Sequence, residues 1–171
     1  MSKLQLKKEI QKLERHQLEQ MVLDAYAARK ETKEYFEFFL NPDVEKLTEK
    51  YKMAVTKEFA RGKRGHSKAR ISIIKKHIKE FESFHPGFDK EIELQFYVIT
   101  YALLTETNIY FSDTLMNGIA AIMERMLETA DRNLVADKLL TRLISVLDDE
   151  TSGTRYFRRY LRDSLSQFRP S

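Results

Sequence analysis

Residues 94–104 read LQFYVITYALL, and this stretch is the strongest indication of the fold because it is apolar on nearly every side of a helix. A surface helix carries its apolar residues on one stripe, whereas a helix that is apolar all round is buried. Phe96, Ile99 and Leu103 keep the helical spacing that continues on both sides of the stretch. The pattern therefore predicts a central helix that opens at Asp89, and the β-branched and aromatic content leaves a strand as the alternative.

Helical spacing of apolar residues and helix start and stop signals divide the rest of the chain. Ser2 and Gln5 form a capping box, and Asn41-Pro42 separates two helices. Ser67 is expected to cap a helix that ends at His85-Pro86-Gly87. The other helices are expected from Ser2 to about Glu14, over His16–Arg29, from Thr32 to Asn41, from Pro42 through Phe59, from Ser67 to His85, and over Thr114–Arg132, Leu134–Asp149 and Thr154–Phe168.

Nine helices with short connections predict an all-α, multihelical protein. Consecutive helices joined by short loops pack antiparallel, so we expect stacked helical hairpins in an α–α array or an irregular bundle. We find no repeat with a period of about 34 or about 40 residues, so a solenoid with a sequence signature is not indicated. No long linker divides the 171 residues, and we expect a single domain over residues 1–171.

Composition narrows the class of protein. With 42% hydrophobic and 33% charged residues the chain is globular. It contains no cysteine, which excludes disulfides and thiolate chemistry. Its first residues lack the apolar core of a signal peptide, and its longest apolar stretch is too short to span a bilayer. We therefore expect a cytoplasmic protein with no membrane partner.

The positive charge of the chain gathers in one segment. Residues 1–87 carry 20 Lys and Arg against 13 Asp and Glu, whereas residues 88–171 carry 10 against 13. Between Arg61 and Lys79 there are eight basic residues and no acid. A cationic loop that leads into a helix N-terminus can hold a phosphate or carboxylate, although a charge run is more often a solvated helix face. The candidate polyanion-binding residues here are Lys63, Arg64, Lys68, Arg70, Lys75, Lys76 and Lys79.

A second basic stripe lies on the last expected helix and consists of Arg155, Arg158, Arg159 and Arg162. Tyr156 and Tyr160 lie between these arginines. Arginine with aromatic residues is typical of phosphate-and-stacking surfaces and of protein interfaces. The alternative, which we favour, is intramolecular pairing with the acids at positions 148–150, because exposed helix arginines commonly find carboxylates.

The run Tyr35, Phe36, Phe38 and Phe39 places more rings side by side than one helix face can bury. We expect these rings to pack in the core, because Phe and Tyr usually lie inside. A pocket or a dimer contact is the alternative.

Residues that could carry enzyme chemistry form no familiar pattern. Of the four histidines only His85 has a glutamate three residues before it, Glu82, and di-iron helical bundles need two such copies on facing helices. No zinc-protease spacing and no nucleophile elbow is present. We therefore predict no catalytic residue, no metal site and no cofactor.

Several segments resemble a known bacterial family, with residues 3–13, 33–42, 50–59 and 70–78 carrying the resemblance. They are similar to uncharacterised all-helical proteins, in particular Bacteroidetes members, that are classed as a domain of unknown function. The resemblance implies an all-helical bacterial protein and points to no particular catalytic activity.

Two functions are favoured by these observations over a third alternative, an enzyme with an unrecognised helical pocket. The first is a non-enzymatic, cytoplasmic helical scaffold or protein-interaction domain whose partner is another protein or a second copy. The alternative is weak binding of nucleic acid or another polyanion through residues 61–79, aided by the arginine stripe.

Overall fold

The computed structural model describes residues 1–60, 62–63, 66–107 and 109–168. Within these ranges it contains nine α-helices and one antiparallel ladder of two residues per strand, so the predicted all-α class is confirmed. The elements are α1 (Lys3–Ile10), α2 (Arg15–Ala28), α3 (Lys30–Leu40), α4 (Val44–Phe59), β1 (Gly62–Lys63), β2 (His66–Ser67), α5 (Ile71–Glu82), α6 (Phe88–Glu106), α7 (Asp113–Arg132), α8 (Ala136–Asp148) and α9 (Arg155–Gln167).

The chain forms two compact units, Met1–Asp43 and Val44–Ser171. The sequence-based expectation of a single domain over residues 1–171, in which both units unfold together, stays a prediction. In the smaller unit α2 packs against α3, where the Tyr26 ring lies 6.5 Å from the Phe36 ring and the Tyr26 hydroxyl donates to Glu37.

The aromatic run of α3 is not buried, so its expected core packing is wrong. No side chain of α1, α2 or α3 is buried, and Phe39 is 69% exposed. Three short helices enclose too little volume to cover rings on every side of α3.

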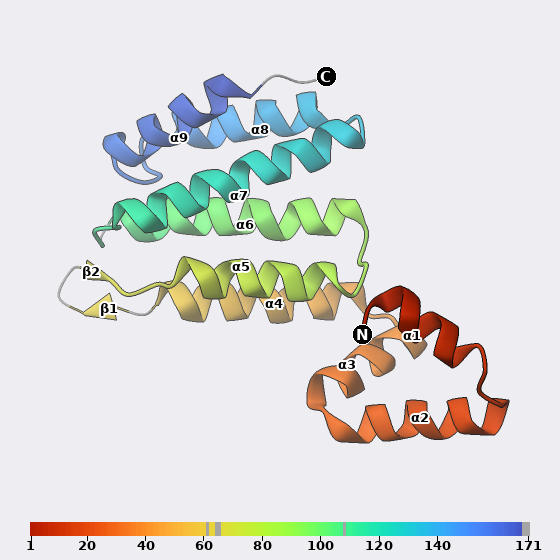
Figure 1. Ribbon diagram of the computed structural model, residues 1–171. Helices are drawn as coiled ribbons and strands as arrows, with labels where there is room; N and C mark the ends of the chain where they lie inside the picture. The colour runs from red at the N-terminus through yellow and green to blue at the C-terminus, as the bar shows by residue number, and fades with distance from the viewer. Residues whose placement is uncertain (61, 64–65, 108, 169–171) are drawn as a thin grey trace. The chain divides into compact units, whose positions relative to one another are not determined.

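The larger unit consists of three antiparallel hairpins, α4/α5, α6/α7 and α8/α9, stacked in that order (Figure 1). This arrangement confirms the expected stacking of helical hairpins. The middle hairpin contacts both outer ones, because α6 packs against α4 and α5 and α7 packs against α8 and α9.

The central helix is α6, as the sequence predicts. Leu94, Val98, Ile99 and Leu103 are completely buried, and Phe96 is 6% exposed. Helices α4, α5, α7 and α9 all contact α6. Each Leu, Ile or Phe that is fully buried contributes about 1.5–3 kcal/mol to folding, so this helix anchors the core of the larger unit.

The ends of the helices follow the sequence signals in some places and not in others. The capping box of Ser2 and Gln5 is present at the start of α1. The sequence predicts that Ser67 caps α5, and this prediction is wrong. Ser67 instead pairs with Gly62 in the β-ladder, and its hydroxyl accepts from the N–H of Ala69. The residue before α5 is Arg70, whose N–H donates to Glu58 at the end of α4 over 2.8 Å.

Gly118 on α7 provides the first test of this packing. A helical Gly→Ala change is ordinarily stabilising by about 0.5–1 kcal/mol, because Ala loses less backbone entropy on folding. A Cβ at Gly118 would lie 2.1 Å from Cγ1 of Ile71 at the start of α5, so we expect Gly118→Ala to destabilise the protein instead. Urea unfolding of Gly118→Ala and of Gly118→Ala/Ile71→Ala measures the effect. A stabilised single variant, or a double variant in which the smaller Ile71 side chain recovers nothing, would contradict the close approach of α5 and α7.

Candidate functional site

A buried carboxylate of α6 fixes where α9 begins. The side chain of Glu106 accepts hydrogen bonds from the N–H and the hydroxyl of Thr154, at 2.9 and 3.0 Å. Thr154 is the N-cap of α9, and its hydroxyl oxygen accepts from the N–H of Phe157. The N–H of Gly153 donates to the Thr107 hydroxyl over 3.1 Å. These bonds hold the first turn of α9 against the last turn of α6.

The first two turns of α9 carry arginines and no acid. Arg155, Arg158 and Arg159 lie near the N-terminus of the helix, where the helix dipole disfavours positive charge. Glu106 is only 8% exposed and supplies the negative charge that the first turn itself lacks. A neighbouring helix thus offsets an unfavourable placement of cations.

The β-ladder lies at the same end of the larger unit as the start of α9 (Figure 1). The N–H of Ser67 donates to the carbonyl of Tyr110 over 3.1 Å. The next residue, Phe111, has its ring 6.0 Å from Phe59 and 5.8 Å from Phe157. The connection between α6 and α7 therefore contacts both the backbone of the β-ladder, through Tyr110, and the first turn of α9, through Phe111.

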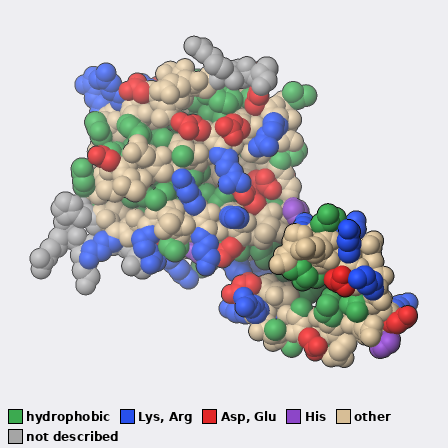
Figure 2. Space-filling model, viewed as in Figure 1, with side chains coloured by type: hydrophobic (Ala, Val, Ile, Leu, Met, Phe, Trp, Pro, Cys, Tyr) green, Lys and Arg blue, Asp and Glu red, His purple; other side chains and the backbone are tan. Residues whose placement is uncertain are grey.

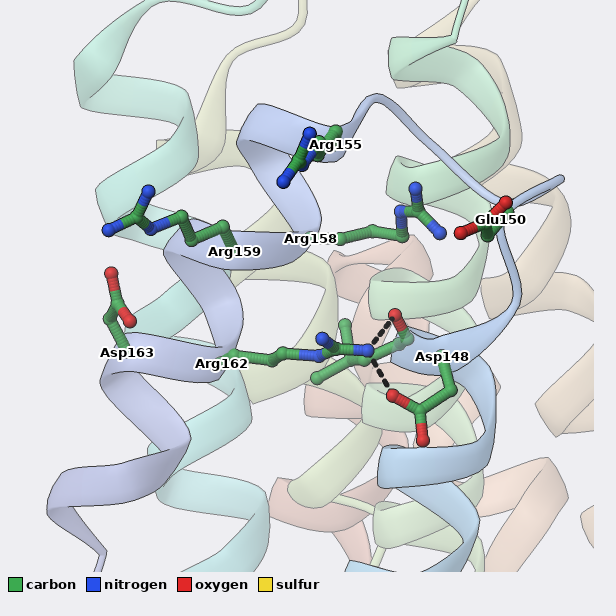
Figure 3. A pocket seen from close by; sticks show the side chains of 8 residues that line it. Asp148, Glu150, Arg155, Arg158, Arg159, Arg162 and Asp163 are labelled. Carbon is green, nitrogen blue, oxygen red and sulfur yellow. Dashed lines mark hydrogen bonds and ion pairs between the residues drawn. The ribbon is translucent and has the colours of Figure 1, made fainter.

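An open cavity of about 620 Å³ lies between α9 and the end of α8 (Figure 3). Arginines and acids line it together: Asp148, Glu150, Arg155, Arg158, Arg159, Arg162 and Asp163, with Leu147. In the close view Arg158 points toward Glu150 in the connection between α8 and α9, and Arg162 points toward Asp148 at the end of α8. Arg159 points to the opposite side of α9. The cavity thus has a mixed lining of four cations and three carboxylates.

The arginines of α9 differ in whether they form hydrogen bonds and ion pairs with the rest of the described chain. Arg162 donates to the Leu147 carbonyl over 2.8 Å and pairs with Asp148. Arg158 donates to the Asp149 carbonyl over 2.8 Å, while its buried Nε–H makes no hydrogen bond to a described residue.

Arg155 and Arg159 make no hydrogen bond or ion pair with any part of the chain that the structure describes. The intramolecular pairing that the sequence analysis favoured is therefore present for Arg162, and it uses a backbone oxygen for Arg158. One pair of arginines, one turn apart, is left over for another partner.

The candidates between Lys63 and Lys79 are spread over several surroundings. Arg70 donates to both oxygens of Glu58, at 3.0 and 3.1 Å, and Lys76 lies 3.5 Å from Glu80. Lys68 is exposed. Arg64 and the side chain of Lys63 lie outside the described residues. Lys75 and Lys79 line a smaller cavity between α5, α6 and α7.

Basic side chains are visible along one edge of the larger unit. Figure 2 shows Lys and Arg gathered where α4 and α5 lie, whereas acidic and basic side chains alternate over the rest of this face. The mixed pattern leaves no broad, purely positive surface on the side in view.

The turn before α9 contains an acid with a shifted pKa. Asp149 accepts from the hydroxyl and the N–H of Thr151, at 2.7 and 2.9 Å. These bonds lower the pKa of Asp149, first through the Thr151 hydroxyl, and Arg158 adds a smaller electrostatic contribution. A lowered pKa means that the turn gains stability above the unfolded-state pKa and loses it as the pH falls through the folded-state value.

The two carboxylates that bond to the residues preceding α5 and α9 were not identified from the sequence. Glu58 and Glu106 lie at the C-terminal ends of α4 and α6, where the helix dipole disfavours an acid. That locally unfavourable position is the sequence signal that points to a partner elsewhere in the fold.

Two other kinds of site are absent from the described ranges. No three His, Asp and Glu side chains there are grouped so that they could hold a metal ion. None of the described helices is both long enough and apolar enough to cross a membrane.

The fold and this site define an all-α protein with stacked helical hairpins and a mixed-charge, arginine-rich cavity beside its last helix. Residues 1–162 match the model of a family of unknown function, DUF6155, and the chain belongs to that family. No curated protein and no solved structure matches the chain.

Replacing Glu106 tests how the arginine helix is held. We expect Glu106→Ala to destabilise the protein by about 1–3 kcal/mol, because it leaves the N–H and hydroxyl of Thr154 without their acceptor. Urea unfolding measures the loss, and Glu150→Ala, which removes an exposed carboxylate, is the control. Equal stability of the two variants would mean that Glu106 does not anchor α9.

The Asp149 turn gives a second test by titration. Thr151→Val removes the hydroxyl that contributes most to the lowered pKa of Asp149. We expect the pKa of Asp149 to rise toward its ordinary value in the variant, as followed by carbon-13 NMR of the carboxyl group. Ser152→Ala is the control because its hydroxyl makes a longer bond, 3.2 Å, to the same carboxylate. A larger pKa rise in Ser152→Ala than in Thr151→Val would contradict this assignment.

Proposed function

We propose that this chain is a non-enzymatic protein-interaction domain that binds an acidic segment of a partner protein through α9. The observation that carries the proposal is the pair of arginines, Arg155 and Arg159, left without a partner among the described residues. Placing cations at a helix N-terminus weakens the helix, and nothing that the structure describes uses these two in return.

The surroundings of these arginines match a protein interface. Tyr156 lies between them and is 64% exposed, and Tyr110 on the adjoining connection is 63% exposed. Tyrosine and arginine are enriched among the residues that dominate the energy of protein interfaces. A carboxylate of the partner would receive the planar donors of an arginine in a bidentate bond.

The charges of the cavity favour a protein over a nucleic acid. Asp148, Glu150 and Asp163 lie among the arginines and would repel a continuous phosphate backbone. A partner peptide that mixes acidic and neutral residues can place each carboxylate against an arginine and avoid these acids. The proposed function also assumes a cytoplasmic location and a bacterial origin, as the sequence suggests. Binding to a second copy of the chain stays a prediction.

Binding of a labelled peptide tests this function. The probe is a ten-residue peptide with four Glu among Leu and Ser, measured by fluorescence anisotropy, and the same peptide with Gln in place of Glu is the control ligand. Because arginines are frequent hot spots, we expect Arg155→Gln/Arg159→Gln to weaken binding of the acidic peptide by about tenfold. The control variant is Arg132→Gln/Lys138→Gln. It removes the same amount of charge at the C-terminal end of α7 and the start of α8, and it should leave peptide binding unchanged.

A thymidine oligonucleotide distinguishes the alternative function. Tighter binding of the oligonucleotide than of the acidic peptide, with affinity that falls steeply as salt rises, would replace this proposal with polyanion binding. Failure of the acidic peptide to bind, or equal binding by both double variants, would also overturn it.

A further inference from the structure

A second cavity, of about 220 Å³, lies between α5, α6 and α7. Lys75 and Lys79 of α5 and Arg125 of α7 bring three cations to its wall. Ile78 and Ile122 form its apolar part, and Gln95 of α6 contributes an amide. The space is too small for a macromolecule and suits a compact solute. It is separate from the cavity beside α9, with which it shares no residue.

Gln95 has an unused hydrogen-bond acceptor. The residue is 1% exposed, and its amide nitrogen donates to Oε1 of Glu82 over 3.1 Å. Its amide oxygen is buried and accepts no hydrogen bond in the described part of the chain. Because buried polar groups are nearly always bonded, this oxygen calls for a donor such as a hydroxyl.

The cations around Gln95 are only partly neutralised. Arg125 pairs with the other oxygen of Glu82 over 2.6 Å, so one carboxylate serves both the amide and the guanidinium. Lys75 and Lys79 are exposed, lie one turn apart on α5 and have no ion pair with a described residue. Like charges at this spacing destabilise a helix, and an anion between them would relieve the repulsion.

We propose that this cavity binds a small oxyanion that carries a hydroxyl group. The carboxylate or phosphate of the ligand pairs with Lys75, Lys79 and Arg125, and its hydroxyl donates to the amide oxygen of Gln95. The hydroxyl supplies the donor that Gln95 lacks, and the anionic group supplies the charge that the lysines lack. This chemistry is independent of the peptide-binding function of α9.

Two matched pairs of ligands test both halves of the proposal by isothermal titration calorimetry. Malate carries one hydroxyl that succinate lacks, and glycerol 3-phosphate carries hydroxyls at both carbons where propyl phosphate has none. At pH 8 a phosphate monoester is a dianion, since its second pKa is about 6, so the carbon-bound hydroxyls are the donors. Glycerol, which is uncharged, shows whether hydroxyl groups alone bind.

In the wild-type protein we expect the hydroxylated member of at least one pair to bind with a dissociation constant of about 1 mM or tighter, and about tenfold tighter than its partner. The pair that shows this preference tells a carboxylate ligand from a phosphate ligand. We expect Lys75→Gln/Lys79→Gln to weaken binding of that ligand by about tenfold or more, since it removes two of the three charges. The matched control is Lys57→Gln/Lys138→Gln, which removes two exposed lysines elsewhere in the larger unit and should change nothing.

Gln95→Met separates the hydroxyl contact from the charge. It removes the acceptor at similar volume, so the preference for the hydroxylated ligand should disappear while succinate or propyl phosphate binds as before. Circular dichroism confirms that each variant is folded, and the lysine variants, whose side chains are exposed, keep the test open if Gln95→Met unfolds.

Three results would overturn the proposal. The first is that none of the four anions binds at about 10 mM, which is well above the expected dissociation constant. The second is that the two members of each pair bind equally tightly. The third is that Lys75→Gln/Lys79→Gln binds the anions as tightly as the wild-type protein does.

Discussion

The structure of the larger unit depends on the need to bury the wide apolar face of α6. Leu94, Val98, Ile99 and Leu103 are fully buried and together span about half of the circumference of this helix. Leu104, on the opposite side, is 61% exposed. Several helices are needed to cover so wide a face, and α4, α5, α7 and α9 all contact α6. Because consecutive helices are joined by short connections, they can cover α6 only as antiparallel hairpins stacked on both sides.

Stacked hairpins bring the C-terminus of one helix beside the N-terminus of another. Glu58 ends α4 and bonds to Arg70 ahead of α5, while Glu106 ends α6 and bonds to Thr154 ahead of α9. Each carboxylate satisfies free N–H groups and offsets positive charge at the start of a basic helix. Two helices that begin with cations can thus be positioned without an acid in their own first turn.

Burial and pairing also decide which cations are left for ligands. The fold uses Arg70 and Arg162 in ion pairs, and it leaves Arg155 and Arg159 on one side and Lys75 and Lys79 on another. These leftover pairs lie in different surroundings, one beside acids and exposed tyrosines and one beside a buried amide. The first arrangement suits an acidic peptide and the second a small hydroxylated anion.

Helical spacing and caps such as Ser2 depend on neighbours within a few residues, so the helices and the buried helix among them could be predicted from the sequence. The sequence did not indicate that Ser67 joins a β-ladder, that the rings around Phe39 stay outside a core, or which arginines are paired. Glu106 and Thr154 are 48 residues apart, and Glu82 and Arg125 are 43 apart. These partners depend on the three-dimensional packing, because a bond between distant residues forms only when the hairpins stack against α6.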